Sequence, residues 1–152
     1  MVKNTPSLNA LESTLNLYFG KKAPALPKEI KELLVKLAPY LAILGMIIAI
    51  PGLLLALGFG GIATMMAPFG GPKMIGYVPG MWLSLLLSVP LVILEIMAIP
   101  GLFKRKMIAW KYLYWAELIA VASSVIQLNI VGAIIGALIG FYLLFQVRSL
   151  YK

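Results

Sequence analysis

Four apolar stretches, separated by short polar or glycine-rich segments, dominate this chain. They cover about residues 38–57, 81–103, 107–126 and 130–147. A helix rises ~1.5 Å per residue, so about twenty residues are enough to cross the ~30 Å hydrocarbon core of a bilayer. The pattern therefore predicts an all-α polytopic membrane protein with four transmembrane helices. We expect residues 38–152 to form this transmembrane domain.

Two short polar segments separate the later stretches. Lys104, Arg105 and Lys106 end the second stretch, and only residues 127–129 separate the third from the fourth. A connection of three residues forces its two helices to be antiparallel neighbours. We therefore predict a tight hairpin of the third and fourth helices.

The connection between the first two stretches, residues 58–80, has a different composition. It contains seven glycines and three prolines, and Lys73 is its only charged residue. Glycine and proline at this density favour a loop, so an outer glycine-rich loop is predicted. Such an apolar loop either dips back into the membrane or rests in the outer headgroup layer.

The first 37 residues are predicted to form a cytoplasmic, interfacial segment. Within residues 5–20, large apolar side chains recur at helical spacing, Ser7 is placed as an N-cap and Gly20 as a stop. This segment is too polar to span a membrane. We expect an amphipathic helix that lies on the headgroups or against a neighbouring subunit. Its apolar face consists of Leu8, Leu11, Leu15 and Tyr18.

The composition agrees with a membrane location. The chain is 62% hydrophobic and 12% charged, whereas soluble domains are roughly 45 to 50% apolar and about 25% charged. Helical spans of this length are typical of a cell (inner) membrane rather than an outer-membrane barrel. A multi-pass inner-membrane protein is therefore predicted.

The basic residues predict the orientation. Of thirteen, twelve fall in three clusters at 3–36, 104–111 and 148–152, and Lys73 alone lies on the other side of the membrane. Because cytoplasmic loops hold an excess of Lys and Arg, both termini are expected in the cytoplasm. The net charge of +8 is then explained by attraction to anionic headgroups, and no nucleic-acid partner is predicted.

Few residues of this chain are of the types that carry out catalysis or bind metals. The chain has no histidine, cysteine or aspartate, which removes thiolate and imidazole metal sites and the Ser-His and Cys-His nucleophile pairs. We predict no catalytic residues, no metal and no cofactor. For a lipid-modifying enzyme the only acid-base candidates are Glu95, Glu117, Lys111 and Tyr114, and no nucleophile accompanies them.

Two acidic residues within the predicted spans suggest function, since ionisable groups are costly there. Glu95 shares a helix face with Ser84 and Ser88, and Glu117 shares one with Ser124 and Gln127. If the two faces meet, they form a polar seam in which the carboxyls could share a proton. Alternatively each acid is paired with a basic or hydroxyl side chain and fixes the rotation of its helix.

Small residues mark one face of the fourth span. Gly132, Gly136 and Gly140 are spaced by four, a pattern that lets two helix backbones approach closely in a membrane. The partner helix belongs either to the same chain or to another subunit.

These patterns lead to a functional hypothesis and one alternative. We expect a small, non-enzymatic membrane protein that acts by helix packing, as a homo-oligomer or an accessory subunit. The alternative is an oligomeric channel or carrier for an ion or small solute, with Glu95 and Glu117 lining its path.

Overall fold

The chain is helical along nearly its whole length. The computed structural model describes the backbone of residues 6–152 and the side chains from residue 10 onward, and no strand occurs in this range. The fold class predicted from the sequence, all-α, is therefore confirmed for this range. In chain order the helical elements are α1 (Pro6–Leu15), the π-helical η1 (Asn16–Lys22), α2 (Lys28–Met66), the short η2 (Ala67–Phe69), α3 (Gly71–Phe103), α4 (Met107–Ile126), α5 (Ile130–Val147) and η3 (Arg148–Leu150).

Three of the helical segments are long and apolar enough to cross a membrane. They are α2 with η2, α3, and α5 with η3. The fourth predicted span, α4, has the predicted bounds, but Lys111 and Glu117 make it less apolar than the other three. The membrane location is thus supported by three helices.

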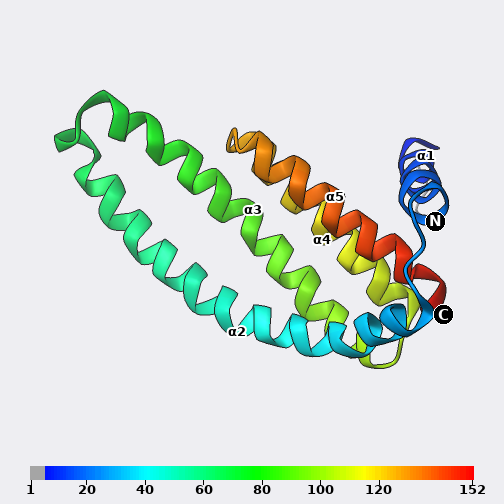
Figure 1. Cartoon of the computed structure of the whole chain (residues 1–152). Coiled ribbons are helices and arrows are strands. Elements are labelled where there is room, and N and C mark those ends of the chain that lie inside the picture. Colours follow the sequence, from blue (N-terminus) through cyan, green and yellow to red (C-terminus); the bar gives the residue numbers. More distant parts are fainter. Residues whose placement is uncertain (1–5) are drawn as a thin grey trace.

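The helices form two antiparallel hairpins of unequal length. Helix α3 lies between α2 and the α4–α5 hairpin (Figure 1). Helices α2 and α3 contain 39 and 33 residues, whereas α4 and α5 contain 20 and 18. Consequently the tip of the α2–α3 hairpin projects beyond the α4–α5 turn (Figure 1).

The predicted outer loop at residues 58–80 is wrong. Helix α2 continues to Met66 and α3 begins at Gly71, so the connection is only a few residues long. Gly71, with φ of 76°, makes the turn, a conformation that glycine adopts without strain. In apolar surroundings the backbone must satisfy its own polar groups, so a helix tolerates glycine and proline that would end it in water. The Trp82 indole also donates to Thr64 Oγ1 at 2.8 Å and joins the two helices.

The best-packed part of the molecule lies between α3, α4 and α5. A Cβ at Gly101 would come within 2.7 Å of the Ala109 Cβ, so α3 and α4 approach very closely there. Trp110 is 0% exposed and donates its indole N–H to the Leu144 carbonyl of α5 at 2.8 Å. Trp110 and Tyr114 lie close to the basic residues 104–106 in the sequence, a pattern that is also typical of an interfacial aromatic belt. That interpretation is wrong, since both are buried and stack on each other at 5.6 Å between ring centroids.

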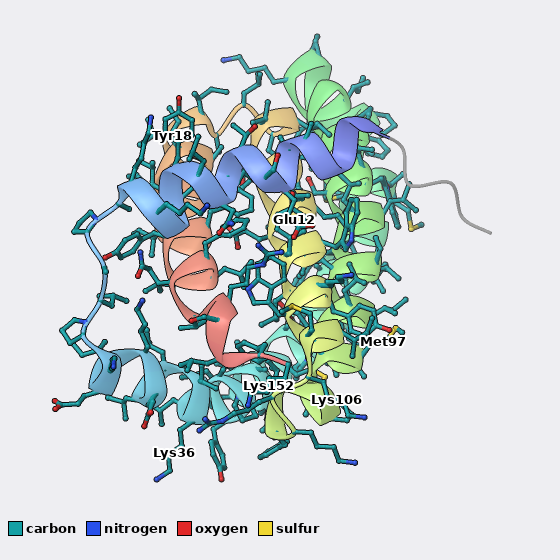
Figure 2. All side chains as sticks on the ribbon, turned by 90° about the vertical axis from the view of Figure 1, so that its right-hand side faces the viewer. Glu12, Tyr18, Lys36, Met97, Lys106 and Lys152 are labelled. Carbon is teal, nitrogen blue, oxygen red and sulfur yellow. The ribbon has the colours of Figure 1, made fainter. Side chains whose placement is uncertain are left out.

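One member of each basic cluster lies at the same end of the molecule. Lys36, Lys106 and Lys152 lie together at this end in Figure 2. Two backbone hydrogen bonds hold the C-terminus against the α3–α4 turn, because Met107 donates to the Lys152 carbonyl at 2.6 Å and Lys152 donates to the Arg105 carbonyl at 2.9 Å. We call this the basic end of the molecule.

Candidate functional site

Glu117 lies at the contact between α4 and α5. The residue is partly buried, and its carboxyl occupies the space where a side chain at Gly140 would otherwise be. A Cβ added at Gly140 would collide with that carboxyl. Gly140 therefore makes room for an acid inside the α4–α5 hairpin, a relation that the sequence did not predict.

Glu95 lies partly buried on α3. Throughout the described residues, neither Glu95 nor Glu117 takes part in a hydrogen bond between side chains or in an ion pair, and the only ion pair joins Glu12 to Arg148. The pairing with Lys, Arg or hydroxyl groups that we considered for these acids is thus not seen. Whether the two carboxyls share a proton stays a prediction.

The serines of the predicted polar seam are satisfied within their own helices. Ser84 and Ser88 donate to the carbonyls of Gly80 and Leu85 at 2.9 and 2.7 Å. Ser124 donates to the Ala120 carbonyl at 3.0 Å. Such bonds to the preceding turn leave these hydroxyls as acceptors only.

The outer end of the seam does bring two predicted residues together. Ser84 of α3 and Gln127 of the α4–α5 turn line one cavity of about 330 Å³. The Gln127 amide donates to Ser123 Oγ at 3.0 Å. The remaining lining is mainly apolar and comes from Gly76, Tyr77, Gly80, Met81, Ile126 and Leu128.

Among the described residues no cluster of three or more acidic, histidine or cysteine side chains could hold a metal. No family model, curated protein or solved structure matches this chain. The features open to functional interpretation are Glu95 and Glu117, the glycine face of α5, the α2–α3 tip and the basic end.

The three glycines of α5 have three different environments. The amide of Gly132 donates to Asn129 Oδ1 at 3.0 Å, which caps the start of α5. Gly140 faces Glu117, whereas a Cβ at Gly136 would meet nothing within 4 Å. Within this chain, then, the three do not pack together against one helix. Only Gly136 is left open to a partner outside the chain.

Lys73 lies in the first turn of α3, at the α2–α3 tip, and is exposed. It lies at the opposite end of α3 from Lys104, Arg105 and Lys106, which directly follow the last residue of that helix. The position agrees with its separation from these clusters in the sequence pattern.

The hydrogen bonds that hold the N-terminal segment against α5 were not predicted from the sequence. Buried Gln146 of α5 donates to the Phe19 carbonyl at 2.9 Å and accepts from the Leu26 amide at 3.2 Å. The Tyr142 hydroxyl donates to the Pro24 carbonyl at 2.7 Å. A glutamine in the otherwise apolar α5 was the available signal, since a buried amide needs partners.

The N-terminal helix crosses α4 and α5 (Figure 2). Of its predicted apolar face, Leu15 packs against the core, whereas Leu11 and Tyr18 are exposed. Ser7 and Leu8 lie outside the residues whose side chains are described. The helical segment continues through Gly20, the predicted stop, and ends at Lys22.

Proposed function

We propose that this protein is a multi-pass inner-membrane protein that acts by helix packing and assembly, with four spans and both termini in the cytoplasm. The observation that carries the proposal is the unequal length of its two hairpins. Helices α2 and α3 continue well past the α4–α5 turn. Their outer part is therefore not covered by the chain's own helices.

The length of α3 supports a protein neighbour at the outer end. Its 33 residues correspond to ~50 Å at ~1.5 Å per residue, against a hydrocarbon core of ~30 Å. Transmembrane helices tilt by about 20° on average and by up to about 40°. Tilting within this range leaves part of the hairpin outside the hydrocarbon.

The outer part of the hairpin is apolar and exposed. Phe69 is 83% exposed, Met65 77% and Phe59 67%. In the headgroup layer or in water, an apolar surface of this kind favours association with another protein. Several glycines on α2 leave bare backbone, because a Cβ would meet nothing within 4 Å at Gly45, Gly52, Gly58 or Gly61. A second helix can approach such a surface closely.

A photo-crosslinking experiment tests the proposal. The photoreactive amino acid benzoylphenylalanine replaces either Phe69 at the α2–α3 tip or Leu128 at the α4–α5 turn, and both variants are irradiated in native membranes. The two positions are matched, because each side chain is 83% exposed. We expect protein adducts from position 69 and few from position 128.

The adducts also distinguish the two forms of assembly. A product of twice the chain mass of 16.5 kDa indicates a homo-oligomer, and a product containing a different chain indicates an accessory subunit. If position 69 gives no more protein adducts than position 128, assembly through the α2–α3 tip is excluded.

A second candidate function is an oligomeric channel or carrier for an ion or small solute. It is favoured by one observation, that Glu95 and Glu117 have no basic partner among the described residues. Unpaired acids in spans are typical of ion and proton pathways. The test is flux of H⁺, Na⁺ and K⁺ into proteoliposomes. Flux that is equal in the wild type and in Glu95→Gln/Glu117→Gln would exclude these acids from the path.

A further inference from the structure

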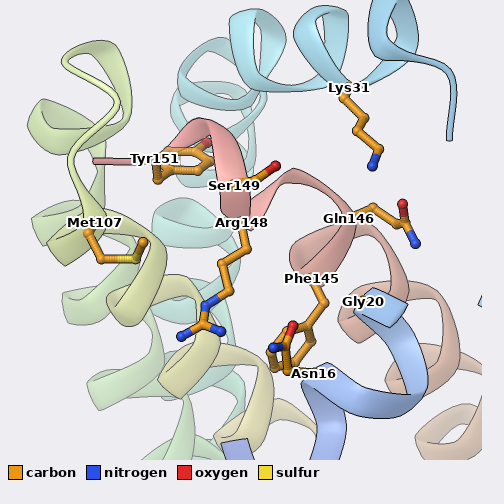
Figure 3. A pocket seen from close by; sticks show the side chains of 9 residues that line it. All are labelled: Asn16, Gly20, Lys31, Met107, Phe145, Gln146, Arg148, Ser149 and Tyr151. Atoms are coloured by element: carbon orange, nitrogen blue, oxygen red, sulfur yellow. The ribbon is translucent and has the colours of Figure 1, made fainter. Parts of the chain in front are cut away.

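A polar cavity lies at the basic end, between the N-terminal segment, the start of α2 and the C-terminus. It has a volume of about 390 Å³ (Figure 3). Its polar lining comes from three segments of the chain. The side chains concerned are Asn16, Lys31, Gln146, Arg148, Ser149 and Tyr151.

The charge of the lining is positive. Lys31 and Arg148 both line the cavity, and no acidic side chain of the described residues does so. Lys31 takes part in no ion pair of the described chain. Arg148 contacts the Glu12 carboxylate through Nη2 at 2.5 Å, so one of the two positive charges is partly neutralised from α1. The positive charge of Lys31 remains without a partner in the described chain.

The cavity also has more donors than acceptors. Lys31 takes part in no ion pair of the described chain. Arg148 donates to Glu12, and its Nε is buried out of reach of a ligand in the cavity. Its charged group lies 4.9 Å from the centre of the Trp110 ring, which holds it in place. The Gln146 oxygen is already used by the Leu26 amide. An acceptor with several oxygens and a negative charge would satisfy the Lys31 ammonium.

Tyr151 adds no negative charge. The side chain is 4% exposed, and burial raises the pKa of its phenol above the ordinary value, while Arg105 only partly opposes this. The phenol is therefore neutral at physiological pH. The electrostatic balance of the cavity is set by Lys31, Arg148 and Glu12.

The cavity lies where apolar helices end. Met107, the first residue of α4, and Arg148, directly after α5, both line it. Ends of spanning helices lie at the level of the lipid headgroups. We propose that this cavity binds the phosphate group of an anionic phospholipid at the cytoplasmic surface. The proposal rests on the membrane location and is independent of assembly.

The phospholipid would contact three parts of the chain at once. Its phosphate oxygens accept from Lys31 of α2, while Arg148 at the C-terminus and Asn16 and Gly20 of η1 line other parts of the same cavity (Figure 3). The bound headgroup therefore stabilises the N-terminal segment against the ends of α2 and α5.

Titration of the purified full chain in a nonionic detergent, followed by native mass spectrometry, tests the site. Phosphatidylglycerol and phosphatidylcholine of the same acyl chains are compared at about 0.15 M salt, where charges more than ~8 Å away are screened. We expect the wild type to bind phosphatidylglycerol more tightly. Equal affinities for the two lipids would overturn the proposal.

Two charge-matched variants locate the binding. Lys31→Gln and Lys36→Gln each remove one positive charge from α2, but Lys36 does not line the cavity. Removing one charge-assisted hydrogen bond weakens binding by about tenfold, so Lys31→Gln should do so, while Lys36→Gln should change the affinity by less than about twofold. Equal losses in the two variants would show general surface attraction and overturn a specific site. Lys31 makes no side-chain hydrogen bond in the structure, so its replacement leaves the fold intact.

A soluble phosphate ester distinguishes the source of the phosphate. Glycerol 1-phosphate carries the same charged group without acyl chains. If it binds weakly or not at all while phosphatidylglycerol binding depends on Lys31, the lipid is supported as the ligand. Lys31-dependent binding of glycerol 1-phosphate, with no preference for the lipid, would overturn the lipid assignment and identify a soluble ester instead.

Discussion

The two hairpins of this protein contrast in how they bury their side chains. At the α4–α5 hairpin, Trp110 is 0% exposed and Phe141 and Phe145 are each 4% exposed. On the outer α2–α3 hairpin, large apolar side chains face outward and several glycines have open space around them. Both hairpins are predominantly apolar, although glycine and proline are concentrated in α2 and α3. The comparison teaches that the α4–α5 end is held by contacts within the chain, whereas the outer α2–α3 part depends on what surrounds it.

The largest expected effect comes from removing the Trp110 indole at the contact between α3, α4 and α5. Trp110→Ala removes a buried ring, its hydrogen bond to the Leu144 carbonyl and its contact with Arg148. We expect a loss of about 3 to 5 kcal/mol in the free energy of unfolding. Denaturation in mixed detergent micelles measures it.

The matched control is Trp82→Ala on the outer hairpin. Trp82 is 39% exposed and donates one hydrogen bond to Thr64, so we expect a loss of only about 1 kcal/mol. If the two tryptophans prove equally important, the proposed contrast between the hairpins fails.

The next prediction compares alanine substitutions at two glycines, whose effects on stability should have opposite signs. Gly101→Ala places a Cβ 2.7 Å from the Ala109 Cβ, whereas Gly52→Ala meets nothing within 4 Å. We expect the first to destabilise by about 1 to 3 kcal/mol and the second to stabilise by up to about 1 kcal/mol through helix propensity. Melting temperatures of both variants in the same detergent decide the comparison. A loss at Gly52 similar to that at Gly101 would indicate an intersubunit contact on α2.

The same contrast explains which features could be predicted from the sequence. The bounds of α4 and α5 were predicted because the connection Gln127–Asn129 interrupts the apolar pattern, and in the structure Asn129 caps α5. The segment 58–80 was mispredicted because glycine and proline indicate loops in water, and a membrane helix tolerates both. Burial of Trp110 was not predicted because an interfacial belt and a buried aromatic cluster have the same composition.

The Glu117 site shows a further limit of sequence patterns. The sequence identified Glu117 and Gly140 separately, as a candidate proton site and as a packing residue. Their contact depends on the rotation of two helices about their axes, and no local pattern fixes that rotation. The cavity with Lys31 and Arg148 was missed for a related reason, since its lining comes from segments distant in sequence.

A smaller effect tests the contact between Glu117 and Gly140. Gly140→Ala forces the carboxyl to move and should destabilise by about 1 to 2 kcal/mol, while Gly136→Ala is expected to be neutral or slightly stabilising because its Cβ would meet nothing. The double variant Gly140→Ala/Glu117→Ala should recover most of the loss, since the shorter side chain leaves space for the new methyl group. Strictly additive effects in this double-mutant cycle would show that the two residues are not coupled.

The smallest expected effect concerns the Glu12–Arg148 ion pair, which joins α1 to the C-terminal residues. Glu12 and Arg148 are partly exposed, so Glu12→Gln should cost about 0.5 to 1 kcal/mol and leave the melting temperature of the helical domain nearly unchanged. Local opening of the N-terminal segment should nevertheless become several-fold more frequent, because the ion pair joins α1 to Arg148 of η3 in addition to the hydrogen bonds of Gln146 and Tyr142. Trypsin cleavage after Lys21 and Lys22 measures this opening, and Glu29→Gln is the control, because Glu29 forms no ion pair in the described chain. Equal cleavage rates in both variants would show that the Gln146 and Tyr142 hydrogen bonds hold the segment without help from Glu12.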